Sequence, residues 1–252
     1  MPYSIILDAG HGGAEPGAIY NDRREKDDTL NLTLEVGRIL SEQGYDVKYT
    51  RTTDVYQTPF QKAQNANETG GDLFVSIHRN SGPEPGRYSG VETLVYDDRG
   101  TKAEIARSIN QQLEQLGFPN LGVSERPNLI VLNSTQMPAL LVEAGFINSE
   151  EDNERFDRQF SEIAEAIAEG IRQVVPPEGE KVLYRVQTGI FRNRQNADRM
   201  LYQLQSQGFP AYLSWENGLF YVQVGGYEEL SRAIQLERQL RNSGYETFIT
   251  TK

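Results

Sequence analysis

Cysteine is absent from the 252-residue chain, and histidine occurs only twice. Without cysteine there can be no disulfide, no thiol nucleophile and no thiolate-bound metal. No run of about 18 apolar residues occurs, so we expect no membrane-spanning segment. Basic residues number 25 against 36 acidic ones, and the net charge of −11 argues against nucleic acid as a partner. The N-terminus lacks the cationic segment and apolar stretch of a secretory signal, and we expect none.

The charge is divided unevenly along the chain, which predicts two domains. From Lys181 onward nine basic residues exceed six acidic ones, whereas the preceding part holds sixteen basic and thirty acidic residues. The change follows a short stretch rich in proline, glycine and glutamate, which is typical of a linker. We therefore predict a first domain over residues 1–175, a linker over 176–180 and a second domain over 181–252.

Short apolar or β-branched runs alternate with helix-like stretches in the first domain. The runs predicted as strands are residues 5–7, 45–51, 73–77, 91–96, 129–132 and 139–142. Helical spacing of apolar residues predicts helices over residues 30–43, 103–116 and 151–173. This alternation predicts an α/β fold with a mostly parallel, mixed sheet covered by helices.

The second domain contains an internal repeat of 36 residues. The shift aligns Val186-Gln187 with Val222-Gln223 and Gly208-Phe209 with Gly244-Tyr245. Each unit reads as strand, helix, glycine and strand, and a tight hairpin is expected at Asn217-Gly218 between the units. The repeat predicts a small α+β domain with two βαβ-like units. A duplicated fold by itself identifies no ligand.

Both histidines follow predicted strands directly. His11 stands after the first strand in a glycine-rich segment, and His78 stands after the strand predicted at residues 73–77. In open α/β sheets, ligands bind at the carboxyl ends of the strands. The two imidazoles are therefore candidates for one site.

Two glutamates are candidates to join them. Glu25 lies in a polar loop just before a helix, where an acid is also favoured by the helix dipole alone. Glu143 follows the apolar run 139–142, and a charged group at the tip of a buried strand is costly unless it is paired or functional.

Two imidazoles and one carboxylate form the ligand set of a catalytic zinc, because they leave the fourth tetrahedral position open. A second glutamate nearby could take a proton from water and return it to a leaving amine. The His-Glu-x-x-His pattern of ordinary zinc proteases is absent. The Gly12-Gly13 pair is not followed by Gly-Lys-Ser/Thr, so a phosphate loop is disfavoured.

Residues 3–173 resemble the zinc-dependent N-acetylmuramoyl-L-alanine amidases of bacterial wall lysins and spore mother-cell lysis enzymes. The matching motifs occur in family order, at residues 8–13, 25–27, 66–67, 73–78, 90–92 and 137–147. The resemblance implies that His11, Glu25 and His78 bind one Zn²⁺ and that Glu143 is the catalytic general base and acid. It implies cleavage of the amide between the lactyl group of N-acetylmuramic acid and the L-alanine of the stem peptide.

The sequence departs from the family pattern after the second histidine. The family usually has Ala-Asn-Ala where Arg79-Asn80-Ser81 stand, and arginine near Lys62 and Asn133. None of these residues is a proposed ligand, so the departures concern substrate contacts, for which Arg79 and Asn80 are candidates. Some relatives also carry an inserted helix that blocks the zinc, whereas here residues 97–100 lead directly into the next predicted helix, which predicts an open site.

Residues 182–250 resemble a SPOR domain, through residues 184–191, 196–197, 208–212 and 221–225. Such domains bind peptidoglycan, particularly glycan strands stripped of stem peptides. The candidate contacts here are Arg185, Gln187, Tyr221 and Gln223. The excess of positive charge suits a wall polymer that carries carboxylates and phosphates.

Two other functions stay open: a zinc peptidase or deacetylase acting on another amide, and a non-catalytic wall-binding or regulatory protein. The ordered motifs argue against the first, and the four filled positions argue against the second. The expected partner is peptidoglycan, both as strands that bear stem peptides and as denuded strands, and no obligate protein partner is evident. Without a secretory signal, the protein is expected to reach the bacterial cell wall after lysis of a sporulating mother cell, or as a holin-assisted phage lysin.

Overall fold

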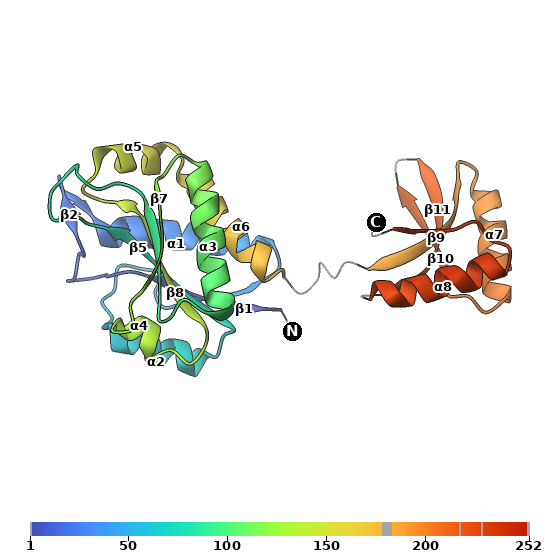
Figure 1. Ribbon diagram of the computed structural model, residues 1–252, viewed down its shortest axis with the longest axis horizontal. Helices are drawn as coiled ribbons and strands as arrows, with labels where there is room; N and C mark the ends of the chain where they lie inside the picture. Colours follow the sequence, from blue (N-terminus) through green and yellow to red (C-terminus); the bar gives the residue numbers. More distant parts are fainter. Residues whose placement is uncertain (1, 178–182, 217, 228, 251–252) are drawn as a thin grey trace. The chain divides into compact units, whose positions relative to one another are not determined.

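A computed structural model of the chain describes residues 2–177, 183–216, 218–227 and 229–250. It forms two compact units, Met1–Gly179 and Glu180–Lys252 (Figure 1). Residues 178–180 of the expected linker lie outside the described residues, as does Asn217 of the expected hairpin. The domain limits at residues 175 and 181 stay a prediction. In the described part of the chain, no helix has the length and hydrophobicity needed to cross a membrane.

A six-stranded sheet in the order β4-β1-β5-β8-β6-β7 forms the centre of the first unit. Its strands are β1 (Ser4–Ala9), β4 (Asp46–Tyr49), β5 (Leu73–Asn80), β6 (Val91–Val95), β7 (Asn120–Glu125) and β8 (Ala139–Phe146). Neighbouring strands are parallel except for β6 and β8, which are antiparallel. The prediction of a mostly parallel, mixed sheet is confirmed.

Helices cover both faces of this sheet. On one face α1 (Glu25–Glu42), α3 (Gly100–Gln115) and α6 (Phe160–Val174) bury the larger apolar cluster, and α5 (Glu150–Arg158) adds Phe156 to it. On the other face α2 (Pro59–Thr69) and α4 (Ile130–Asn133) lie side by side over a smaller cluster, as Figure 1 shows. Because strand residues alternate between faces, Phe74 points to the smaller cluster and its neighbours Leu73 and Val75 point to the larger one.

Several elements differ from the sequence-based expectation. Residues 129–132, predicted as a strand, lead into the one-turn helix α4, which packs Val131 and Leu132 into the smaller cluster. An apolar run this short does not distinguish a strand from a buried helical turn. The helix predicted over residues 151–173 is divided at Gln159, where φ is −120° and ψ is 30°. Helix α1 begins at Glu25, five residues earlier than expected, and α2 and β7 were not predicted at all.

A small hairpin carries the chain into α1. It consists of β2 (Ile19–Tyr20) and β3 (Arg23–Arg24), and its turn residues Asn21 and Asp22 have φ values of 47° and 64°. A two-residue turn with both φ values positive matches the natural twist of the paired strands. The hairpin therefore fixes Glu25, the next residue, as the first residue of the helix.

The second unit is a four-stranded antiparallel sheet in the order β10-β11-β9-β12. Its elements are β9 (Tyr184–Phe191), α7 (Arg194–Ser206), β10 (Ala211–Glu216), β11 (Leu219–Tyr227), α8 (Leu230–Asn242) and β12 (Phe248–Thr250). The two βαβ units interleave, because β11 lies between β9 and β10 and β9 lies between β11 and β12. Val186, Val222 and Val224 form the core with residues of both helices. The predicted α+β fold with two repeats is confirmed.

Candidate metal centre

The loop after β1 brings His11 back over the sheet. His11 itself has a φ of 59°, and Gly10 donates its backbone N–H to Ile77 O at 3.0 Å. A Cβ atom at Gly10 would lie 2.5 Å from His78 Cε1, so only glycine leaves room for the second imidazole. The local sequence Gly10-His11 therefore places the two rings in contact, with centroids 4.8 Å apart.

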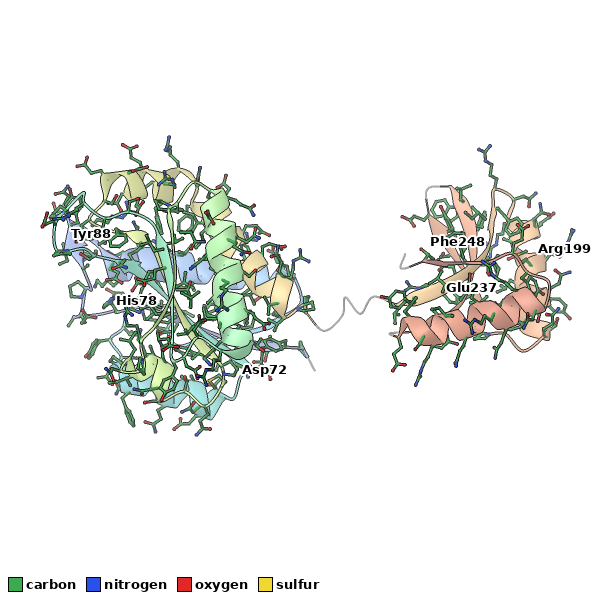
Figure 2. All side chains as sticks on the ribbon, in the orientation of Figure 1. Asp72, His78, Tyr88, Arg199, Glu237 and Phe248 are labelled. Atoms are coloured by element: carbon green, nitrogen blue, oxygen red, sulfur yellow. The ribbon has the colours of Figure 1, made fainter. Side chains whose placement is uncertain are left out.

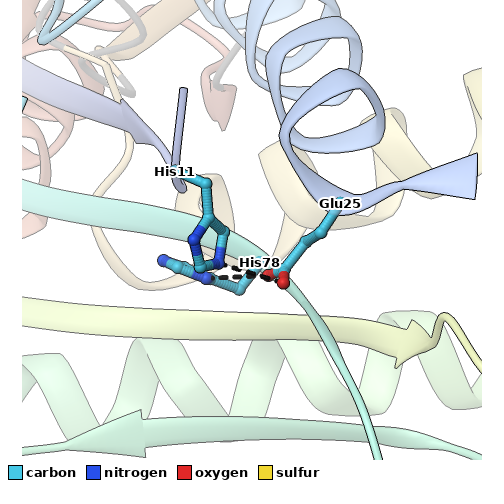
Figure 3. A group of neighbouring side chains, drawn as sticks. All are labelled: His11, Glu25 and His78. Carbon is cyan, nitrogen blue, oxygen red and sulfur yellow. Dashed lines mark hydrogen bonds and ion pairs between the residues drawn. The ribbon is translucent and has the colours of Figure 1, made fainter. Parts of the chain in front are cut away.

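Three side chains from three separate elements converge at this point. One ligand atom from each of His11, Glu25 and His78 lies within 4.8 Å of the others (Figure 3). Glu25 Oε2 is 3.0 Å from His11 Nε2, and Glu25 Oε1 is 2.9 Å from His78 Nδ1. His78 lies among the strands of the first unit (Figure 2), on β5. The sequence predicted these three residues as one site, and the structure brings them together.

The carboxylate of Glu25 is buried and held as an anion. Ala18 and Arg79 donate backbone N–H bonds to it at 2.9 and 3.1 Å. Although burial opposes ionisation, hydrogen bonds with His11 and His78 hold the pKa of Glu25 well below its usual value. For His11, burial lowers the pKa, but the hydrogen bonds with Glu25 and Glu15 prevail and raise it. The cluster is thus an anionic group between two nitrogen donors, which is a donor set suited to zinc.

Glu143 lies beside this cluster on β8. It is the register partner of His78 on one side and of Glu92 on the other. Its Oε2 atom is buried and has no hydrogen-bond partner within the described residues. Burial raises the pKa of Glu143 to about 7, opposed by the charge of His78 and assisted by the carboxylates of Glu25 and Glu92. The sequence predicted Glu143 at the end of its strand, but β8 continues to Phe146.

Buried charges for which the sequence predicted no role support the loop of His11. Lys62 Nζ lies 2.9 Å from Asp8 Oδ1 and donates to Ala9 O at 2.6 Å. Arg51 donates to Ala9 O at 3.1 Å and to Gly10 O at 2.7 Å. In the sequence, these buried charges are indicated only by Asp8, which directly follows the apolar run Ile5–Leu7. These cations hold the backbone carbonyls just before His11 and leave the loop little freedom.

A cavity of about 440 Å³ opens next to the two histidines. Its walls include Tyr56, Leu129, Ile130, Val131 and Leu141, together with His11 and His78. Apolar walls around a few polar groups are typical of a substrate pocket. Residues 96–99, all of which the structure describes, connect β6 to α3 without an intervening helix.

The side chain of Arg79, predicted as a substrate contact, is buried away from the cavity, although its backbone N–H donates to Glu25 Oε1. Its side chain is 2% exposed, and it pairs with Asp28 at 2.6 Å and donates to Asn153 Oδ1 at 2.7 Å. The guanidinium carbon also stands 4.1 Å from the ring centroid of Phe156. Because β5 extends through Asn80, adjacent residues point to opposite faces, so Arg79 turns away from His78. Asn80 is partly exposed, and as a substrate contact it stays a prediction.

The four candidate contacts of the second unit share the sheet face that α7 and α8 leave uncovered, because they alternate with the core valines. Gln187 and Gln223 are register partners, and they are only 4% and 5% exposed. Gln187 Nε2 is buried without a hydrogen-bond partner in the part of the chain that is described. Arg185 and Tyr221 are partly exposed on the same face.

Family models match both units of the chain. The model of the N-acetylmuramoyl-L-alanine amidase family matches residues 5–173, and the SPOR domain model matches residues 180–251. The sporulation-specific N-acetylmuramoyl-L-alanine amidase of Bacillus subtilis is 32% identical over 215 residues, which cover 82% of each chain. The endolysin of Bacillus phage SPP1 is 35% identical over 69% of this chain and 67% of its own.

Solved structures agree with this assignment. The crystal structure of an N-acetylmuramoyl-L-alanine amidase from Clostridium difficile 630 superimposes with a TM-score of 0.64 at 29% identity. The match covers 68% of this chain and 95% of that one. The chain belongs to the N-acetylmuramoyl-L-alanine amidase family and carries a C-terminal SPOR domain.

Proposed function

We propose that this protein is a zinc-dependent amidase that cuts the bond between the lactyl group of N-acetylmuramic acid and the L-alanine of the stem peptide. His11, Glu25 and His78 would hold one Zn²⁺, and Glu143 would act as general base and acid. The observation that carries the proposal is the convergence of two imidazole nitrogens and a carboxylate oxygen within 4.8 Å, beside a buried carboxylate oxygen that has no partner.

Zinc bound by these residues would supply a Lewis acid that polarises the amide carbonyl and makes nearby water more acidic. Glu143 takes a proton from the attacking water as the new C–O bond forms. It returns the proton to the nitrogen of L-alanine as the C–N bond breaks, so the leaving group departs as a neutral amine. Burial raises the pKa of Glu143 above its usual value, which suits a carboxyl that must both accept and donate a proton.

The second unit would anchor the enzyme to peptidoglycan, including glycan strands from which the stem peptides have been removed. The buried Gln187 amide offers an unused N–H donor on the uncovered sheet face, beside Arg185, Tyr221 and Gln223. Hydroxyl and acetamido oxygens of a glycan are suitable acceptors for such a donor. Anchoring raises the effective concentration of substrate at the catalytic unit.

We place its action at the bacterial cell wall, in wall lysis during sporulation. The similarity to a sporulation-specific amidase over 82% of the chain supports this role. The similarity to a phage endolysin keeps phage-type lysis as the second setting.

The test is mass spectrometry of purified sacculi digested by the zinc-loaded protein, with an EDTA-treated sample as control. The expected products are free stem peptides with an unblocked L-alanine amine, released only when zinc is present. Disaccharide-linked fragments cut within the peptide would instead identify a zinc peptidase. Binding without any product would identify a non-catalytic wall-binding protein.

A further inference from the structure

Glu15 contacts the imidazole of His11 on the side away from Glu25. One carboxylate oxygen, Oε2, is hydrogen-bonded to His11 Nδ1, while His11 Nε2 faces Glu25 Oε2 at 3.0 Å. The two ring nitrogens of His11 therefore have separate partners. Only Nε2 is directed at the three-ligand cluster.

The second oxygen of Glu15 organises the loop that surrounds the cluster. Oε1 accepts the backbone N–H of Gly17 at 3.0 Å, and the backbone of Glu15 pairs with Gly12 in both directions at 2.9 and 3.1 Å. The next residue after Gly17, Ala18, donates its N–H to Glu25 Oε2 at 2.9 Å. One carboxylate thus connects the positions of two candidate ligands, His11 and Glu25.

Gly17 shows how closely this loop approaches the site. It has a φ of 69°, and a Cβ atom there would lie 2.6 Å from both Glu25 Oε2 and His11 Cδ2. The backbone held by Glu15 therefore packs directly on both ligands. A residue with a side chain at position 17 would collide with both candidate ligands.

We propose that Glu15 is a positioning residue of the metal centre: it holds the proton of His11 on Nδ1 and turns Nε2 toward the metal. A histidine ligand commonly donates its second ring N–H to a carboxylate, which fixes the tautomer and the orientation of the ring. Loss of such a partner typically weakens metal binding about 10–100-fold. This inference rests on the zinc site proposed above.

The test compares zinc affinity in full-length Glu15→Ala, Glu15→Gln and Asp54→Ala, by competition with a chromophoric chelator. Asp54 is the matched control, because it holds the same loop through Gly13 N at 2.7 Å and Lys26 Nζ at 2.7 Å without contacting a ligand. Glu15→Ala should lose about 10–100-fold in affinity, and Asp54→Ala should stay close to the parent protein. Glu15→Gln should fall between them, because His11 and Gly17 bond different oxygens of Glu15 and glutamine has an oxygen at only one of these two positions.

A second measurement reads the tautomer directly. The chain has only two histidines, so ¹⁵N-histidine labelling gives two imidazole spin systems. In the zinc-loaded parent the Nδ1–H proton of His11 should be protected from exchange with water, and Glu15→Ala should lose that protection. The signals of His78 report in each variant whether the surrounding fold is intact.

Each outcome decides between the proposals. Unchanged zinc affinity and an unchanged His11 signal in Glu15→Ala would overturn the role of Glu15 while leaving the zinc site in place. Equal losses of zinc affinity in Glu15→Ala and Asp54→Ala would mean that Glu15 only stabilises the loop, which also overturns the inference. A parent protein that binds no zinc would instead refute the proposed metal centre itself.

Discussion

His78 on β5 and Glu143 on β8 are register partners across two parallel strands at the centre of the sheet. Neighbouring strands lie about 4.8 Å apart, so the sheet itself sets the separation between a candidate ligand and the candidate base. Side chains on packed strands are held more firmly than side chains on loops. This pairing places Glu143 next to a residue of the candidate metal centre.

Glu143→Gln should retain zinc and lose catalysis. The amide is nearly isosteric but cannot take a proton from water, and general acid–base catalysis contributes about 10²–10⁴ in rate. Stem-peptide release from sacculi measures the activity, and atomic absorption measures the metal. Near-normal turnover in this variant would show that Glu143 is not the base.

His78→Ala should lose both metal and activity. The two remaining ligands, His11 and Glu25, hold zinc poorly. The chain has no third histidine that could replace the imidazole of His78. Metal content after gel filtration gives the result directly. Restoration of the EDTA-treated parent by added zinc is the control, and one zinc per chain in the variant would contradict the ligand set.

The stability of the metal-free protein should depend on pH because Glu143 is buried. The folded-state pKa of Glu143 is raised from 4.5 to about 7, so the folded state binds the proton more tightly than the unfolded state. Stability therefore decreases as pH rises through this range, and Glu143→Gln removes the decrease. The free energy of unfolding of the variant should equal that of the parent below about pH 4.5 and exceed it by about 3 kcal/mol above pH 7.

Calorimetry of the EDTA-treated proteins at pH 4.5 and pH 8 measures this difference. The single tryptophan, Trp215, lies on β10, so its fluorescence follows the second unit and should not differ between parent and variant. A stability difference that is the same at both pH values would contradict the assignment.

The sequence was sufficient to predict the residues of the site but not their full surroundings. His11, Glu25, His78 and Glu143 stand in local patterns, namely a strand end, a helix start and an apolar run, and the fold brings strand ends together. Glu15 was missed because its contact with His11 depends on a loop in which His11 adopts a positive φ. The glycines around His11 indicate a turn, but they do not show which side chain the turn brings to the imidazole.

The surroundings of three further candidate residues could not be predicted from the sequence either. Arg79 was a candidate because it departs from the family pattern directly after His78, but β5 continues to Asn80, and alternation turns the Arg79 side chain to the opposite face. Gln187 and Gln223 were predicted as contacts on the sheet. They are register partners on the two inner strands, β9 and β11, and both are almost completely buried, which a repeat pattern does not reveal.

Arg79→Met should therefore affect stability and not substrate binding. It removes a buried guanidinium that pairs with Asp28 and packs on Phe156, and breaking a buried pair costs about 3 kcal/mol or more. KM per folded molecule should stay unchanged. Arg24→Met is the matched control, because Arg24 is exposed and pairs only at the surface with Asp27, so its loss should cost less than about 1 kcal/mol. A large rise in KM without destabilisation would contradict this prediction and indicate that Arg79 contacts the substrate.

A chain that ends at Pro177 should bind sacculi much more weakly but cleave a small soluble muropeptide almost normally. The reason is that linked modules can raise overall affinity by about 10²–10⁴ without altering either site. Sacculus pull-down and muropeptide kinetics on the same preparations separate the two effects. Equal losses in both assays would contradict a separate anchor.

Within the full chain, Arg185→Ala should reduce sacculus binding severalfold, because Arg185 lies on the sheet face opposite the helices. Arg199→Ala removes the same charge from the exposed surface of α7, where Figure 2 labels it, and should leave binding unchanged. Equal effects of the two substitutions would mean that net positive charge, and not the uncovered sheet face, attracts the wall polymer. If only Arg185→Ala weakens sacculus binding, and adding Gln187→Ala weakens it further, the glycan binds on that face.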